Sequence, residues 1–157
     1  MKTQERVEKL SDAEALALYE RVSRVMAGAV DLDAIEKQAS NTFGISVESM
    51  QKVDIPADQA MPIVRESLSM WATNKELSLL VDNFLDKPIK VQGVGIIFSL
   101  GTVLITTLAT SSIKLKYKDG KWEFSFDSEN ISDNAVKIVE KVLSVLPKNL
   151  KSLIGMK

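Results

Sequence analysis

The chain carries its longest uncharged stretch between Val91 and Ile113, where the sequence reads VQGVGIIFSLGTVLITTLATSSI. Its central part has a mean hydropathy of about +1.7, close to the level at which membrane helices are identified. The stretch is also long enough to span a bilayer, which takes about 20 residues. Its glycine, serine and threonine residues dilute the apolar content, and a buried helix or two buried strands would look alike. We predict that the segment is buried against protein, with membrane insertion as the alternative.

Two alternating runs follow the uncharged stretch. Residues Ile113–Tyr117 and Trp122–Phe126 alternate apolar and polar side chains, and Asp119 and Gly120 lie in the turn between them. Asp-Gly between such runs predicts a β-hairpin, because Gly accepts the positive φ that the turn demands. A two-stranded hairpin is marginally stable alone, so its apolar face needs support. We expect that support from a last helix, capped by Ser132.

Amphipathic segments with explicit start signals precede the uncharged stretch. Ser11 and Glu14 have the spacing of a capping box, and Asp31 and Ser46 are suited to cap the next two helices. Gly44 is suited to a left-handed residue at a helix C-terminus. Behind these signals apolar residues recur at helical spacing. We predict five short helices, in the segments 12–29, 32–43, 46–53, 61–72 and 77–85.

Two proline-containing segments set the expected helix boundaries. Pro62 is favoured at a first helical position, so we start the fourth helix near Met61. The segment Asp54–Asp58 reads as a turn. The resulting fold class is α+β, mostly α. Residues 10–88 are predicted to form a small helical bundle, adaptor-like, and residues 89–157 an apolar segment, a β-hairpin and a C-terminal helix.

The composition restricts the chemistry. The chain has 157 residues, of which 45% are hydrophobic and 26% charged, as in folded globular proteins. It has no His and no Cys, which removes the commonest general base, the usual nucleophile pairs and thiolate zinc sites. The glycines of the uncharged stretch lack the Lys-Ser/Thr of a phosphate-binding loop and are better suited to close helix packing. We therefore expect no enzyme activity, no cofactor and no metal.

Charge is divided unevenly along the chain. Residues Met1–Pro88 hold 10 basic and 15 acidic side chains and the remainder hold 10 and 6, which gives −5 and +4 within a total of −1. Opposite charge on two halves suggests self-association or an anionic partner, although two solvated surfaces would have the same composition. The N-terminal residues lack the apolar stretch of a secretory signal. We expect a cytoplasmic location, with membrane association as an alternative, and no nucleic-acid partner.

Five residues are candidates for an interaction surface. Lys114, Lys116, Lys118 and Lys121 form a basic strip along the predicted hairpin. Such a strip could bind lipid phosphates. It could equally be the solvated face of the hairpin, where lysines prevent another strand from pairing with the edge. Trp71 is the fifth candidate, as an interface anchor, although its position in an amphipathic segment equally predicts a core residue.

Two pairs of carboxylates are close in sequence. Asp31 and Asp33 are explained best by a helix cap. Asp82 and Asp86 have i, i+4 spacing and share a helix face, where a solvated surface is the simplest interpretation. Neither pair predicts an acid/base or magnesium site.

The segments 67–72 and 75–81 carry a family resemblance. They read SLSMWA and KELSLLV, and together with Phe43-Gly44 they resemble the effector-associated domains of bacteria, small helical modules of the death-domain-like superfamily. The resemblance covers about residues Leu10–Pro88. It implies an adaptor that associates with itself or a related helical module in a bacterial conflict or antiviral system. A membrane-active effector that inserts residues 91–113, and a soluble α+β ligand-binding module, are the alternatives.

Overall fold

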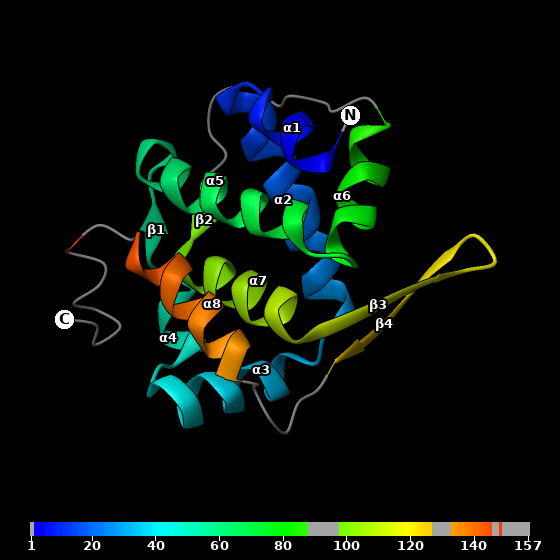
Figure 1. Cartoon of the computed structure of the whole chain (residues 1–157). Coiled ribbons are helices and arrows are strands. Elements are labelled where there is room, and N and C mark those ends of the chain that lie inside the picture. Colours follow the sequence, from blue (N-terminus) through cyan, green and yellow to red (C-terminus); the bar gives the residue numbers. More distant parts are fainter. Residues whose placement is uncertain (1, 88–97, 127–132, 146–147, 149–157) are drawn as a thin grey trace.

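Helices form most of this protein, as predicted. A computed structural model describes residues 2–87, 98–126, 133–145 and 148 (Figure 1). The helices are α1 (Thr3–Glu8), α2 (Asp12–Ala29), α3 (Leu32–Gln38), a π-helical turn η1 (Ala39–Phe43), α4 (Val47–Met50), α5 (Ala57–Thr73), α6 (Leu77–Leu85), α7 (Leu100–Ser112) and α8 (Asp133–Ser144). The strands are β1 (Asp54–Ile55), β2 (Phe98–Ser99), β3 (Ile113–Lys118) and β4 (Lys121–Phe126).

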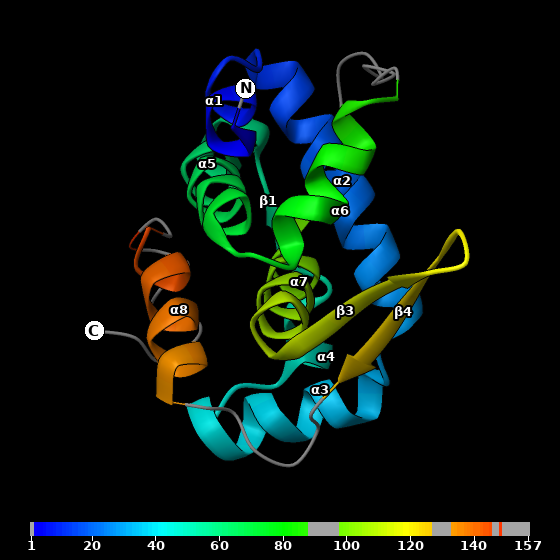
Figure 2. The same ribbon diagram turned by 45° about the vertical axis from the view of Figure 1, so that its right-hand side comes forward.

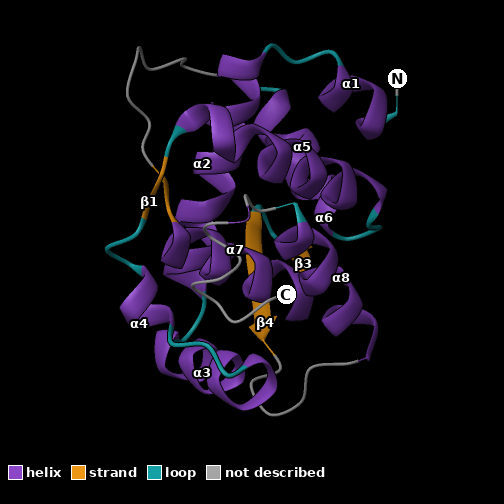
Figure 3. Ribbon diagram, turned by 90° about the vertical axis from the view of Figure 1, so that its left-hand side faces the viewer, coloured by secondary structure: helices purple, strands orange, loops and turns teal. Residues whose placement is uncertain are grey.

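Helix α7 lies in the middle of the other helices (Figures 1 and 3). It packs against α2, α3, α4 and α8, and Leu100, Leu104 and Leu108 are at most 1% exposed. The uncharged stretch is therefore buried against protein over α7, while residues 91–97 lie outside the described part. One hydrophobic cluster runs from Val7 in α1 to Val142 in α8, so both predicted units contribute to a shared core. No helix within the described residues is long and apolar enough to cross a membrane.

The capping signals in the sequence act as predicted. The Glu14 N–H donates to Ser11 Oγ at 3.1 Å, and the Ser11 N–H donates to Glu14 Oε1 at 3.0 Å, which completes the capping box of α2. Asp31 caps α3 and Ser46 caps α4 in the same manner. Gly44 follows η1 with a φ of 66°, a left-handed conformation that glycine adopts without strain. Local hydrogen bonds thus fix where these helices begin and end.

The boundaries predicted around the prolines were wrong. Helix α5 begins at Ala57, after Pro56, and Pro62 lies inside it. Pro62 lacks an N–H, so only one hydrogen bond, to the Asp58 carbonyl in the exposed first turn, is lost. The segment predicted as a turn contains β1, whose Ile55 pairs with Phe98 of β2. A partner this far along the chain leaves no local signal.

Helix α1 was not predicted, and its contacts change the interpretation of two carboxylates. Arg6 donates to Asp82 Oδ1 of α6 at 3.1 Å and to Oδ1 of Asp86, the residue directly after α6, at 2.8 Å. Thr3 Oγ1 adds a hydrogen bond to Asp82 at 2.8 Å. The hydrogen bond to Asp86, followed by the other contacts, raises the pKa of Arg6. Asp82 and Asp86 therefore fasten α1 to α6 and are not merely a solvated face.

Strands β3 and β4 form an antiparallel pair that starts directly at the end of α7. Their register pairs Ile113 with Phe126 at one end and Lys118 with Lys121 at the other. Asp119 and Gly120 form the turn with φ values of 52° and 76°, as a two-residue hairpin loop requires. The strands extend away from the helices, on the side of α7 opposite α8 (Figure 2).

Helix α8 does not provide the support for the hairpin that we expected. It packs against α7 and α5, with Val139 and Val142 buried. Lys141 Nζ also lies 3.1 Å from Glu66 Oε1 of α5. The apolar side of α8 is satisfied by the helical core, which a local pattern could not distinguish from the hairpin. The expected cap at Ser132 lies outside the described residues.

Candidate functional site

Trp71 is a core residue and not an exposed anchor. Its side chain is 4% exposed, and its ring stacks on Tyr19 of α2 with centroids 5.4 Å apart and planes inclined by 11°. Stacked aromatic pairs at this separation stabilise a core beyond their buried area. Of the two roles considered for Trp71, the structure supports the one in the core.

A small cavity lies beside Trp71. It has a volume of about 50 Å³ and is bordered by Asn74 after α5, by Thr107 and Thr110 of α7, and by Val142 of α8. The volume suffices for a few water molecules and not for a metabolite. We therefore do not take it as a ligand site.

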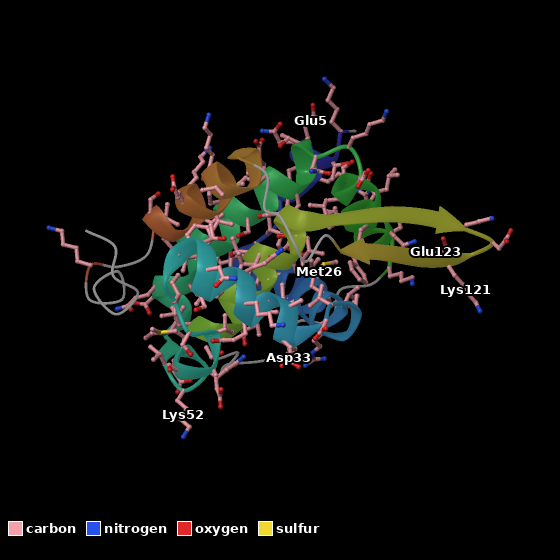
Figure 4. All side chains as sticks on the ribbon, turned by 90° about the horizontal axis from the view of Figure 1, so that it is seen from below. Glu5, Met26, Asp33, Lys52, Lys121 and Glu123 are labelled. Carbon is pink, nitrogen blue, oxygen red and sulfur yellow. The ribbon has the colours of Figure 1, made fainter. Side chains whose placement is uncertain are left out.

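The four candidate lysines lie along the hairpin. Lys118 and Lys121 flank the turn, face each other in the register and are both exposed. Lys114 and Lys116 lie in β3, opposite Ser125 and Glu123, and their side chains lie outside the described part. The exposed ammonium groups of Lys118 and Lys121 therefore lie at the tip of the hairpin, beyond the helices. Lys121 is labelled in Figure 4.

A second surface, which we did not predict from the sequence, lies where α3, α4 and α7 meet. It is an open pocket of about 220 Å³, named here the α3–α4 groove. Its lining residues are Leu32, Asp33, Glu36, Val47, Glu48, Gln51 and Ile105. The apolar part comes from three elements, since Val47 and Ile105 are nearly buried and Leu32 is 52% exposed. The groove therefore combines an apolar floor with a carboxylate rim.

Close packing of α7 on α4 forms the floor of this groove. Gly101 lies against Gln51, where a Cβ atom would come within 2.9 Å of the Gln51 Cα and backbone nitrogen. Real Cβ atoms do not approach backbone this closely, so glycine is required at this position. The contact brings Ile105, one turn further along α7, beside Val47 and Leu32. This agrees with the prediction that glycine in the uncharged stretch permits close helix packing.

The rim of the groove concentrates negative charge. Glu36 Oε2 accepts the backbone N–H of Glu48 at 3.1 Å, which holds the α3 carboxylate at the start of α4. Asp33 and Glu48 are exposed, and Asp33 is labelled in Figure 4. Carboxylates grouped on a partly apolar surface attract cations more strongly than isolated ones, because low-dielectric walls focus the field.

Ion pairs within the described residues occur elsewhere. Four cations take part, and the pairs are Arg6–Asp82, Arg6–Asp86, Arg24–Glu20, Arg65–Asp12 and Lys141–Glu66. In the part of the chain that the structure describes, no such pair includes Asp33, Glu36 or Glu48. Nor does any group of three acidic side chains there have the arrangement of a metal site. The rim is thus left with charge that a cationic partner could neutralise.

The sequence held one signal for the groove, and we interpreted it differently. Leu32 and Ile35 both belong to the apolar residues that recur at helical spacing in the predicted helix 32–43, but Ile35 is fully buried and Leu32 is not. Asp31 and Asp33 were explained by capping, which holds for Asp31, whose Oδ1 accepts the Asp33 N–H at 3.0 Å. The available clue in the sequence was a leucine placed between two aspartates, Asp31 and Asp33. Its meaning depended on α4 and α7 lying beside it.

Comparisons with protein-family models, with curated proteins and with solved structures found no match to this chain.

Proposed function

We propose that this protein is a non-enzymatic adaptor that associates with itself, or with a related helical module, in a bacterial conflict or antiviral system. The resemblance of residues 10–88 to effector-associated, death-like modules supports the biological setting. The absence of His and Cys from the sequence supports a role without catalysis. In finer detail, we propose a death-like arrangement for the first six α-helices, with the hairpin as an added contact element.

The observation that carries the proposal is the α3–α4 groove. Leu32 of the groove is exposed, and among the described residues no ion pair engages the groove's carboxylates, so this surface has contacts left to make. An apolar patch with a charged rim is the usual composition of a protein interface, in which the centre excludes water and the rim sets orientation. A chain of this size needs no such surface to fold, because the core is already continuous from α1 to α8.

Two other features are consistent with a binding role. The carboxylates that were closest to a catalytic pair, Asp82 and Asp86, are engaged by Arg6. The cavity beside Trp71 is too small for a substrate. The groove and the basic hairpin tip are both accessible among the described residues, and both are suited to charged protein surfaces.

Light scattering of the full chain at low and high salt tests this proposal. We expect a mass above the 17.3 kDa of one chain at low salt, falling toward it as salt is raised, because screening weakens contacts between exposed charges. Apolar association would not weaken with salt. A chain that stays at the mass of one copy at every salt and protein concentration would contradict self-association. Sedimentation with anionic vesicles in the same buffers would reveal a lipid surface as the partner instead.

A further inference from the structure

We infer that the hairpin tip of one copy, Lys118–Lys121, docks in the α3–α4 groove of a second copy. This inference rests on the proposed self-association and names the two surfaces that perform it. It follows from the charge of the tip, the charge of the groove, the apolar floor of the groove and the direction of the hairpin.

The hairpin tip carries charge that the fold of one chain leaves unrelieved. Lys118 and Lys121 are directly opposite each other in the register, and like charges at opposite positions of a strand pair repel. Both side chains are exposed, and in the described part of the chain no ion pair includes either of them. Asp119 between them offsets only part of this charge. Carboxylates of another molecule would relieve the repulsion.

The two surfaces have equal and opposite charge in sequence. Residues 113–126 hold four lysines against Asp119 and Glu123, a net of +2. Residues 31–52, which form the groove side, hold four carboxylates against Lys37 and Lys52, a net of −2. Complementary patches of this kind accelerate encounter and fix orientation.

The floor of the groove suits lysine in particular. A lysine has a four-carbon stem that packs on apolar surface while its ammonium group remains in a polar environment. Leu32 and Ile105 offer such a surface, and the carboxylates of Asp33, Glu36 and Glu48 border it. The pocket of about 220 Å³ takes side chains and not a whole strand, as expected for contact with a narrow tip.

The direction of the hairpin excludes docking within one chain. The tip projects beyond the helices (Figure 1), and Figure 4 shows Lys121 of the tip and Asp33 of the groove well apart on the molecule. Tip and groove are different surfaces, so each copy offers one of each. An interface of this head-to-tail type generates a ring where the rotation closes and a filament where it does not.

Charge reversal on each surface provides the test. The tip variant is Lys118→Glu with Lys121→Glu, and the groove variant is Asp33→Lys with Glu48→Lys. Glu36 is left unchanged because its carboxylate accepts a backbone N–H. All four positions are exposed, and circular dichroism would verify that each variant folds. Lys9→Glu with Lys75→Glu is the matched control for the tip variant, since it lowers the net charge by the same amount at exposed positions elsewhere.

We expect each variant alone to associate about tenfold or more weakly than the unchanged chain in sedimentation velocity, because like charges would meet at the interface. An equimolar mixture of the two variants should regain association, since each acidic tip then meets a basic groove and each basic tip an acidic groove. The lysine control should associate as the unchanged chain does.

Three results would overturn the inference. Association of both variants at the original strength would place the interface elsewhere and leave the proposed adaptor function intact. Weak association of the variants that mixing does not restore would show that tip and groove do not meet. An unchanged chain that never self-associates would refute the proposed self-association itself, and tip-dependent sedimentation with anionic vesicles would then assign the lysines to a lipid surface.

Discussion

Tyr19 of α2 and Trp71 of α5 stack within the core, with ring centroids 5.4 Å apart and planes inclined by 11°. Both side chains are buried. Burial raises the pKa of the Tyr19 phenol well above its usual range, and the neighbouring hydroxyl groups of Thr106, Ser23 and Ser67 partly oppose that rise. The pair therefore joins α2 to α5 at a point where α7 also supplies a polar contact.

Replacing Trp71 with Ala should destabilise the protein by about 3–5 kcal/mol, because a large aromatic side chain leaves a cavity that the core fills only in part. Urea unfolding followed by circular dichroism measures the change. Trp71→Phe keeps an aromatic ring against Tyr19 and should cost clearly less. Loss of self-association with an unchanged unfolding midpoint would instead return Trp71 to the role of an interface anchor.

Gly101→Ala should destabilise the protein by about 1–3 kcal/mol, because the added Cβ meets the Gln51 backbone and α7 must shift on α4. The control is Gly28→Ala in α2, where nothing lies within 4 Å of the new atom. Because Gly28 is the second-last residue of α2, that change should stabilise by at most about 0.5–1 kcal/mol, the gain that alanine gives in the middle of a helix. Thermal melts of the two variants should therefore move in opposite directions. A Gly101 variant as stable as the Gly28 variant would show that the contact is not tight.

Thr106 joins α7 to α2 through a buried hydrogen bond. Its hydroxyl proton is shared between Ser23 Oγ at 3.0 Å and the Thr102 carbonyl oxygen at 2.8 Å, and Ser23 donates to the Tyr19 carbonyl at 2.9 Å. Thr106→Val keeps the shape and removes the bond, so it should destabilise by about 1–2 kcal/mol. Thr110→Val is the matched control, because the Thr110 hydroxyl bonds only to carbonyls of its own helix among the described contacts. Equal stability of the two variants would assign no special role to the contact between helices.

Glu14 should give the stability of the protein a dependence on pH. Hydrogen bonds from the Ser11 backbone and side chain lower the pKa of Glu14 below its usual value. A carboxyl with a lowered folded-state pKa stabilises the fold above its unfolded pKa of about 4.3, and that stabilisation is lost as pH falls through the folded value. Glu14→Gln keeps a hydrogen-bond acceptor without the charge. Its unfolding midpoint in urea should approach that of the unchanged chain as pH falls below about 4, and a constant difference would contradict the expectation.

The packing of α7 bears on whether residues 10–88 form a unit of their own. Helix α7 lies against α2, α3 and α4, so a chain ending at Lys87 would expose the apolar side chains of those helices to water. We expect such a chain to keep helical circular dichroism but to melt without cooperativity. A chain ending at Phe126 keeps α7 and should melt cooperatively at a lower temperature. A sharp melt of the shorter chain would establish residues 10–88 as an independent unit.

The features that local physics controls can be predicted from the amino-acid sequence. Ser11, Asp31, Ser46 and Gly44 act within a few residues of themselves, and the ends of α2, α3, η1 and α4 follow from their side-chain hydrogen bonds or backbone freedom. The composition of residues 91–113 indicated burial, because an uncharged apolar segment in water needs protein around it. These predictions did not require knowing which other segment of the chain packs against each element.

Which helices and strands contact each other becomes clear only in the tertiary structure. Helix α1 is held by carboxylates more than 70 residues away in sequence. Strand β1 likewise pairs with β2, which follows α6 in the chain. Leu32 and Ile35 follow the same helical pattern, yet Leu32 is exposed and Ile35 belongs to the buried core. The α3–α4 groove exists because Gly101 lets α7 approach Gln51. A contact between distant segments depends on the whole packing, and no local pattern of residues encodes it.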